Sequence, residues 1–299
     1  MKQKVSLVLS GGGARGTAHI GVIEELENQG FEISAIAGTS MGALVGGVYA
    51  LGQMDAYKNW LCSLDKMMVF NMVDFTFNGA GLVKGDRIIH KMREMFSDRN
   101  IEDLPIPFAA VAADIINRKE VVFDRGSVMD AIRASIAIPT VFTPVKTNDG
   151  LLVDGGIVNN IPVDHVKRST GDILVVVDVN AAVPVERPEI HPEEKERQHS
   201  VYAQKVKEFY DHLFNSHPGT HEEKISYFEV LNRTISLIAY HSSQFLLQNH
   251  SPDVLISISH ECCGIYDFYK AHEMIDTGRF AAAKALMNFK NRDKAVSSG

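Results

Sequence analysis

Two short apolar runs in the sequence each end in a glycine-rich turn that leads into a segment with helical periodicity. Residues 5–9 precede the glycines of residues 11–16, and residues 33–37 precede the turn at residues 38–42. Continuous apolar runs of this length are typical of strands buried on both faces, and a strand–helix–strand–helix order favours a parallel sheet. The sequence therefore predicts an α/β fold in which both turns lie at the carboxyl edge of the sheet, where open α/β sheets bind ligands.

The same pattern continues along much of the chain. Further strands are predicted at residues 108–114, 120–124, 151–153, 173–179 and 254–258, and helices at residues 17–29, 41–51, 86–96, 128–135 and, in segments around Gly278, 271–289. We expect a single domain over residues 1–299, built as a three-layer α/β sandwich with a mostly parallel central sheet and a helical C-terminal elaboration.

Residues 186–249 interrupt this pattern as an insertion. Charged and polar residues with two prolines mark an exposed connection at 186–199. Two apolar stripes, at 202–214 and 228–245, predict a helical hairpin. Residues 250–299 are then expected to supply a closing strand and helices.

Charge and cysteine content exclude several classes of protein. Lys and Arg total 30 against 37 Asp and Glu, a formal charge of −7, which argues against general binding to nucleic acid or anionic lipid headgroups. Cys62, Cys262 and Cys263 do not make a disulfide framework, which favours a reducing, cytoplasmic compartment. The apolar run at 5–9 is too short for a signal peptide, and strand, turn and helix explain the uncharged residues 33–54 better than a membrane span does.

The first glycine turn fits the pattern G-x-G-x-x-G. Residues 11–16 read Gly-Gly-Gly-Ala-Arg-Gly between a predicted strand and a helix, which is where a dinucleotide-binding loop lies. A dinucleotide site also needs an acidic residue at the end of the second strand, but residues 38–40 there read Gly-Thr-Ser. The loop instead presents backbone N–H groups at a helix N-terminus, which stabilise an anion such as an oxyanion.

The second turn has the pattern G-x-S-x-G. Residues 38–42 read Gly-Thr-Ser-Met-Gly at a strand-to-helix turn, where a serine is projected above the sheet as a nucleophile; a glycine-rich helix start is the alternative. Such a serine needs a base, either an Asp–His pair or a lone carboxylate. Residues 154–156, Asp-Gly-Gly, follow a predicted strand and offer a carboxylate, although an ordinary β-turn has the same residue types.

Four blocks in this order resemble the bacterial patatin-like phospholipases. They are the glycine loop at 11–16 with its basic Arg15, the turn at 38–42, Ala-Ser-Ile-Ala-Ile-Pro at 134–139, and Asp-Gly-Gly at 154–156. The resemblance implies a patatin-like α/β fold. It also implies a serine lipid acyl hydrolase that cleaves fatty acyl esters of phospholipids or related lipids through an acyl-enzyme.

A Ser–Asp dyad in place of a triad is part of what the resemblance implies. Ser40 would be the nucleophile and Asp154 the general base. The other expected site residues are Gly11, Gly12, Gly13, Arg15 and Gly16 in the oxyanion hole, Gly38 and Gly42 in the nucleophile turn, and Gly155 and Gly156 in the turn that supports the base. Arg15 is alternatively a charge that satisfies the turn or forms a surface ion pair. No cofactor and no metal is expected.

The histidines offer alternatives to this dyad. His165 could complete a triad, although a histidine on a short helix is more often structural. His19 follows the glycine loop and is expected to brace it. His217 and His221 have the spacing of metal ligands, but the intervening Pro-Gly prevents a shared helix face.

Apolar surface bears on the substrate class and on partners. The Met- and Phe-rich segment at 66–83 and the helix at 223–249 could each form a lid or a membrane surface, or simply pack in the core. We expect a lipid ester substrate and no nucleic acid, with transient contact with a membrane surface and a homodimer as open alternatives. The rival functions are a short-chain esterase or thioesterase with the same dyad and a non-catalytic lipid-binding regulator.

Overall fold

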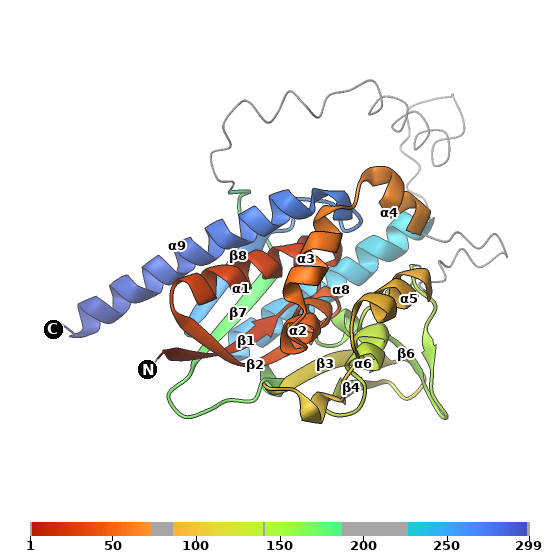
Figure 1. Cartoon of the computed structure of the whole chain (residues 1–299), viewed down its shortest axis with the longest axis horizontal. Helices are drawn as coiled ribbons and strands as arrows, with labels where there is room; N and C mark the ends of the chain where they lie inside the picture. The colour runs from red at the N-terminus through yellow and green to blue at the C-terminus, as the bar shows by residue number, and fades with distance from the viewer. Residues whose placement is uncertain (1, 73–85, 140, 187–226, 298–299) are drawn as a thin grey trace, which may run out of the picture.

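A mostly parallel sheet lies at the centre of the molecule (Figure 1). The computed structural model describes residues 2–72, 86–139, 141–186 and 227–297, and within them the sheet has eight strands in the order β5-β6-β3-β2-β1-β7-β8, with β4 paired to β3. The strands are β1 (Gln3–Leu9), β2 (Phe31–Thr39), β3 (Phe108–Asp114), β4 (Lys119–Phe123), β5 (Val145–Lys146), β6 (Leu151–Asp154), β7 (Ile173–Ala181) and β8 (Val254–Ser259). β1, β2, β3, β7 and β8 run parallel, whereas β4 and β6 each pair antiparallel with β3, and β5 pairs antiparallel with β6. The predicted α/β fold is confirmed.

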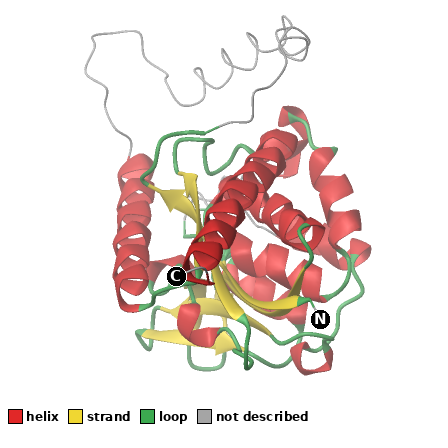
Figure 2. Cartoon of the chain, turned by 90° about the vertical axis from the view of Figure 1, so that its left-hand side faces the viewer, coloured by secondary structure: helices red, strands yellow, loops and turns green. Residues whose placement is uncertain are grey.

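Helices cover both faces of this sheet (Figure 2). The helices are α1 (Ala18–Asn28), α2 (Met41–Ala50), α3 (Met54–Cys62), α4 (Lys66–Met72), α5 (Asp86–Met95), α6 (Val128–Ser135), α8 (Tyr227–Asn249) and α9 (Ala271–Ser297). Short 3-10 turns are η1 (Gly13–Thr17), η2 (Ile101–Asp103), η3 (Gly155–Ile157), η4 (Val163–His165) and η7 (Phe268–Lys270). α1, α2 and α9 pack on one face and α8 on the other, which makes three layers.

The side chains of β1 build both cores. Leu7 and Leu9 are fully buried in the larger core with α1, α2 and α9. Val8 faces the opposite way and belongs to a smaller core, against which Leu246 and Leu247 of α8 pack. Because successive strand residues point to opposite faces, a strand covered on both sides is apolar at nearly every position. Residues 5–9, in which Ser6 is the one polar residue, thus encode a central strand of a covered sheet.

The last helix differs from the prediction. The sequence predicts separate helical segments around Gly278, but α9 is one helix that continues through this residue. A side chain at Gly278 would collide with the backbone of Ala18 in α1, and one at Gly21 of α1 would collide with the backbone of Ile275 in α9. Close packing of the two helices offsets the low helix propensity of glycine, about 1 kcal/mol. Packing on α1 thus explains why the predicted helical segments form one continuous helix.

Parts of the predicted insertion and of the Met- and Phe-rich segment lie outside the described residues. They include the first helix of the predicted hairpin, at 202–214, and residues 73–83. α8 corresponds to the second helix of that hairpin. No helix of the described ranges combines the length and the apolar character needed to cross a membrane.

Candidate active site

Ser40 lies at the turn between β2 and α2 in a strained backbone conformation. Its φ is 55° and its ψ is −122°, and the only other non-glycine residue of the described ranges with a positive φ is Arg118. Glycines make this tight turn feasible, because a side chain at Gly38 would collide with the backbone of Gly42, and one at Gly42 with the carbonyl of Leu9. Such strain costs about 1–3 kcal/mol and persists only where the surroundings impose it. The geometry is that of a turn that exposes a serine nucleophile.

The carboxyl group of Asp154 is buried beside Ser40. The Asp154 amide donates a 2.9 Å hydrogen bond to the carbonyl of Ala137, and its Oδ1 accepts a 2.8 Å bond from the Gly156 amide. Oδ2 is buried and has no partner of normal hydrogen-bond geometry. Burial raises the pKa of Asp154 to about 6, and interactions with the Ser40 side chain and the Gly156 amide oppose that rise. A carboxylate with this pKa accepts a proton more readily than an ordinary aspartate does.

The Asp-Gly-Gly turn is shaped by close backbone packing. A side chain at Gly155 would collide with the carbonyl of Val111 in β3, and one at Gly156 would come within 3.1 Å of both Asp154 Oδ1 and Asn160 Oδ1. Glycines at both positions therefore let the carboxylate approach the end of β3. The structure brings Asp154 and Ser40, which are far apart in sequence, to one place.

The glycine loop lies against the serine. A Cβ on Gly11 would stand 3.1 Å from the Cβ of Ser40, so a larger residue would fill the space beside the hydroxyl. Gly13 has a φ of 57°, in the left-handed region that favours glycine. In the described part of the chain, no hydrogen bond occupies the N–H groups of Gly12 and Gly13. These two amides are therefore available to a bound oxyanion.

Arg15 holds the glycine loop in place through hydrogen bonds to residues after it in the chain. Its guanidinium donates a 2.7 Å hydrogen bond to Asn180 Oδ1 and a 3.3 Å bond to the carbonyl of His260. Asn180 in turn donates a 2.6 Å bond to the carbonyl of Gly11. Burial lowers the pKa of Arg15. This arrangement fits the alternative in which Arg15 satisfies the turn. Gly16 has a packing role, because its Cβ would overlap the first side chain of α2.

Ser135 holds the nucleophile turn in place, a role that the sequence does not reveal. Its hydroxyl oxygen accepts a 2.8 Å hydrogen bond from the Ser40 amide and donates a 2.6 Å bond to the carbonyl of Val111. Ser135 is fully buried at the end of α6. A serine on the apolar face of a predicted helix is the signal that would have identified it, because buried hydroxyls need hydrogen-bond partners.

Asn160 is a second residue whose role the sequence does not reveal. Its backbone carbonyl accepts a 3.2 Å hydrogen bond from Gly11, and its side-chain amide donates a 3.0 Å bond to the buried hydroxyl of Ser243 in α8. Its Oδ1 lies close to both Gly11 and Gly156. Asn160 therefore links the glycine loop, the Asp154 turn and α8.

Neither His19 nor His165 makes a hydrogen bond to Asp154. His19 is fully buried and hydrogen-bonds through Nε2 to the Ser10 carbonyl at 2.8 Å; burial lowers its pKa to about 4. It therefore braces the start of the glycine loop as a neutral side chain. His165 Nε2 lies 2.9 Å from Glu120 Oε1, which also accepts a 2.8 Å bond from Asn159. Pairing with Glu120 leaves His165 out of a triad with Ser40.

α8 places an apolar face next to these residues. Ser242 donates a 3.0 Å hydrogen bond to the carbonyl of Val158, which follows η3 and is itself 42% exposed. No charged residue occurs over 234–249. The exposed large apolar side chains of α8 are Val230, Leu237, Ile238 and Phe245.

Metal ligands do not gather in the described ranges: no group of three or more His, Cys, Asp or Glu side chains could hold an ion there. His217 and His221 lie outside these ranges.

Comparisons with known proteins identify the family of this chain. A model of the patatin-like phospholipase family matches residues 7–167. An uncharacterised NTE family protein of Mycobacterium bovis is 31% identical over 335 residues, covering 97% of this chain and 93% of the relative. The lysophospholipase NTE1 of Saccharomyces cerevisiae is 31% identical over 188 residues, which cover 60% of this chain and 11% of that protein. Among solved structures, VipD from Legionella pneumophila aligns over 96% of this chain and 67% of its own, with a TM-score of 0.46 and 14% identity.

Proposed function

The chain belongs to the patatin-like phospholipase family and is a lipid acyl hydrolase, and from this premise we propose that it cleaves fatty acyl ester bonds of phospholipids or related lipids. In this proposal Ser40 forms the acyl-enzyme and Asp154 is the general base. A relative named as a lysophospholipase supports phospholipid esters as the substrate class.

The proposal rests on the buried, unpartnered oxygen of Asp154. A buried acceptor left without a hydrogen bond costs about 1–3 kcal/mol, and such exceptions call for a functional explanation. Oδ2 carries this cost beside Ser40, which has the strained positive φ. A proton that passes from the Ser40 hydroxyl to Oδ2 during the reaction would remove this cost.

In the acylation step, Ser40 Oγ attacks the ester carbonyl and its proton passes to Asp154 Oδ2. The carbonyl oxygen becomes an oxyanion, which accepts hydrogen bonds from the Gly12 and Gly13 amides. Preorganised donors of this kind each contribute on the order of 10² to 10³ in rate. Collapse of the tetrahedral intermediate breaks the ester bond, and Asp154 returns the proton to the departing alcohol.

In the deacylation step, Asp154 removes a proton from water, which attacks the acyl carbonyl on Ser40. The same two amides stabilise the second oxyanion. The Ser40–acyl bond then breaks, the proton returns to Ser40, and the fatty acid leaves. One carboxylate serves both steps because it alternates between base and acid.

Product analysis tests this function against its rivals. The purified protein is incubated with a long-chain phospholipid, the matching lysophospholipid, a short-chain ester and an acyl thioester. We expect release of free fatty acid from the long-chain lipids, with kcat/KM at least about tenfold above that for the short-chain ester, and no release by Ser40→Ala. Faster cleavage of the short-chain ester or the thioester would assign the chain to the first rival class.

A lipid-binding regulator without catalysis predicts a different result. It would bind lipid vesicles but release no fatty acid from any of the four substrates. Ser127→Ala is the matched control for Ser40→Ala, because Ser127 caps α6 by accepting a hydrogen bond from Asp130. That variant should keep its activity while unfolding at a lower temperature.

We further propose that α8 contacts the lipid surface and that the enzyme acts at the cytoplasmic side of a membrane. α8 exposes Leu237, Ile238 and Phe245 within a stretch, 234–249, that contains no Asp, Glu, Lys or Arg. Ser242 and Ser243 join this helix to the turns around Asp154 and Gly11. The negative net charge disfavours an electrostatic attraction to anionic lipid, so the contact is apolar and insensitive to salt.

Vesicle sedimentation tests this contact. Phosphatidylcholine vesicles should retain wild-type protein at both low and high salt, and Leu237→Ser with Phe245→Ser should weaken retention at least about tenfold, because each exposed side chain contributes about 1.5–3 kcal/mol when buried. Hydrolysis of a water-soluble ester should not change. A homodimer in solution that dissociates in this double variant would instead assign the face to a second copy of the chain.

A further inference from the structure

Two adjacent cysteines lie behind the glycine loop. Cys262 and Cys263 follow β8 and are buried, with 4% and 5% of their surfaces exposed. The positive charge of Arg15 interacts with both thiols. Two acidic side chains also interact with these groups: Asp178 with Arg15, and Asp267 with Cys263. The proposed hydrolysis uses neither cysteine.

The pair is prepared to ionise. The neighbouring Cys263 side chain lowers the pKa of the Cys262 thiol and Arg15 lowers it further, while burial opposes this change. The same interaction raises the pKa of Cys263. A lowered pKa increases the share of thiolate, which is the form that oxidants attack.

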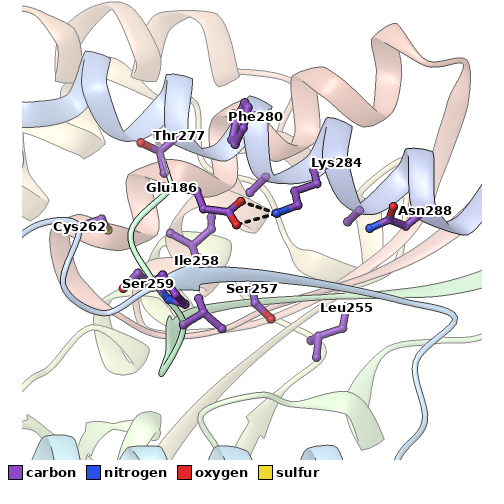
Figure 3. A pocket seen from close by; sticks show the side chains of 14 residues that line it. Glu186, Leu255, Ser257, Ile258, Ser259, Cys262, Thr277, Phe280, Lys284 and Asn288 are labelled. Atoms are coloured by element: carbon purple, nitrogen blue, oxygen red, sulfur yellow. Dashed lines mark hydrogen bonds and ion pairs between the residues drawn. The ribbon is translucent and has the colours of Figure 1, made fainter. Parts of the chain in front are cut away.

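A cavity between β8 and α9 reaches Cys262 (Figure 3). Its volume is about 220 Å³, and Thr277 and Phe280 of α9 form part of its wall. Cys262 lies at one end of the cavity and Asn288 at the other (Figure 3). Since a water molecule occupies about 30 Å³ of liquid, a small peroxide has room to enter and reach the sulfur.

The segment that carries the cysteines also holds the glycine loop. The carbonyl of Ile265 accepts a 2.9 Å hydrogen bond from the Ala14 amide, and the carbonyl of His260 accepts a 3.3 Å bond from Arg15. Gly13 packs so closely on Ile265 that a Cβ would come within 2.5 Å of its carbonyl oxygen. A change of backbone between His260 and Ile265 therefore moves the loop whose amides face the oxyanion.

We propose that Cys262 and Cys263 are a peroxide-sensitive modification site, at which oxidation to a vicinal disulfide displaces the glycine loop and stops hydrolysis. The effect on catalysis rests on the proposed function, whereas the oxidation itself does not.

The chemistry is a two-electron oxidation of the pair by a peroxide. The Cys262 thiolate attacks one oxygen of hydrogen peroxide, the O–O bond breaks, and the products are a sulfenic acid and hydroxide. Cys263 sulfur then attacks the sulfenic sulfur, which forms the S–S bond and releases the second oxygen as water. Overall, two thiols and one peroxide give one disulfide and two waters. A dithiol reductant reverses the change by exchange.

Reversibility follows from strain. Adjacent Cα atoms are about 3.8 Å apart across a trans peptide, whereas disulfides usually join Cα atoms about 4.4–6.8 Å apart. Residues 262 and 263 must therefore twist the intervening backbone to form the bond. That twist is transmitted to His260 and Ile265 on either side, and the strain makes the disulfide easy to reduce in a thiol-rich compartment.

Peroxide treatment of the full-length wild-type protein tests the proposal. After exposure, free thiols are blocked with N-ethylmaleimide and the protein is digested with trypsin. Mass spectrometry then measures the mass of peptide 234–270, whose two cysteines are Cys262 and Cys263. We expect this peptide to carry no maleimide and to have a mass two hydrogens below that of the free dithiol peptide. We also expect kcat for fatty acid release to fall at least about tenfold, with KM little changed. Dithiothreitol should restore the thiols and the activity at the same rate.

Three variants give the controls. Cys62→Ser should respond to peroxide as wild type does, because Cys62 lies in α3 near Lys58 and burial raises its pKa. Cys263→Ser, or Cys263→Ala where serine destabilises the site, should form no disulfide and accumulate a sulfenic acid at Cys262 that dimedone traps.

Several outcomes would overturn the inference. One is a disulfide at these cysteines with kcat unchanged; another is loss of activity that dithiothreitol does not restore, which would indicate methionine oxidation. A peptide that keeps both maleimides under peroxide would also contradict it. Failure of the proposed hydrolysis would look different, because the reduced protein would then release no fatty acid while the disulfide still formed.

Discussion

The backbone N–H of Ser40 donates a 2.8 Å hydrogen bond to the hydroxyl oxygen of Ser135, and that hydroxyl donates a 2.6 Å bond to the carbonyl of Val111. Through one buried side chain, α6 and β3 hold the strained turn that follows β2. The orientation of the proposed nucleophile therefore depends on a residue 95 positions away in the chain.

Ser135→Ala is expected to lower kcat by about 10- to 100-fold. The change leaves the Ser40 amide buried without an acceptor, at a cost of about 1–3 kcal/mol, and the turn can relax away from the reactive geometry. Steady-state kinetics on a soluble ester measure the loss. Ser127→Ala on the same helix is the control, and an equal loss of kcat in both variants would contradict a positioning role for Ser135.

Gly11→Ala is expected to abolish hydrolysis. The new methyl group would stand 2.6 Å from Asn160 Oδ1 and 3.1 Å from the Cβ of Ser40, so it would occupy the space proposed for the substrate carbonyl. Gly171→Ala is the matched control, because Gly171 also lies in a turn, with a φ of 79° and open space around it. The control should lose about 1 kcal/mol of stability and keep its kcat. Activity retained by Gly11→Ala would move the oxyanion site elsewhere.

Asp154→Asn should stabilise the fold at high pH. Burial raises the pKa of Asp154 to about 6 from its ordinary 3.8, so its contribution to stability is full below about pH 4 and is lost as pH rises through 6. Above that pH the buried carboxylate costs up to about 3 kcal/mol, a cost that the neutral amide does not carry. Urea unfolding should give the variant a larger free energy of unfolding than wild type at pH 8 and an equal one near pH 4. A pH-independent difference would contradict the raised pKa.

His165→Asn separates the dyad from a triad. Because His165 pairs with Glu120, the variant should keep kcat within about threefold of wild type. The Glu120 partner raises the pKa of His165, so the pair's contribution to stability is full below about pH 6.5 and declines as pH rises through the higher folded pKa. The unfolding temperature of His165→Asn should therefore fall further below that of wild type at pH 5.5 than at pH 9. A loss of kcat by orders of magnitude would make His165 the base.

Local patterns were enough to predict the parallel strands and the turns between them. The apolar run before Gly11 and the glycines around Ser40 depend on contacts within a few residues or with the adjacent strand, so the sequence encodes them directly. The continuity of α9 through Gly278 could not be predicted in this way, because the deciding contact, with Ala18, comes from the opposite end of the chain.

The supporting residues of the candidate site could not be predicted in the same way. Ser135 and Asn160 act on the backbone of distant turns. The position of Ser135 on the apolar face of a predicted helix indicates that it has a buried partner, but the sequence does not show which partner that is. Arg15 was assigned to the oxyanion loop by its position, but its partners, Asn180 and His260, lie in β7 and after β8. Only the folded structure shows that Arg15 and its partners hold the glycine loop in place.

The rate at which a fluorophosphonate modifies the protein, measured by intact mass between about pH 4.5 and pH 9, tests most directly whether Asp154 activates Ser40. Wild type should take up one phosphonyl group, on Ser40, at a rate that rises with pH around a midpoint of about 6. Asp154→Asn should react at least about 100-fold more slowly and without that midpoint, and Ser40→Ala should not react. A wild-type protein that remains unmodified, or that is modified equally fast when Asp154 is replaced, would contradict the dyad.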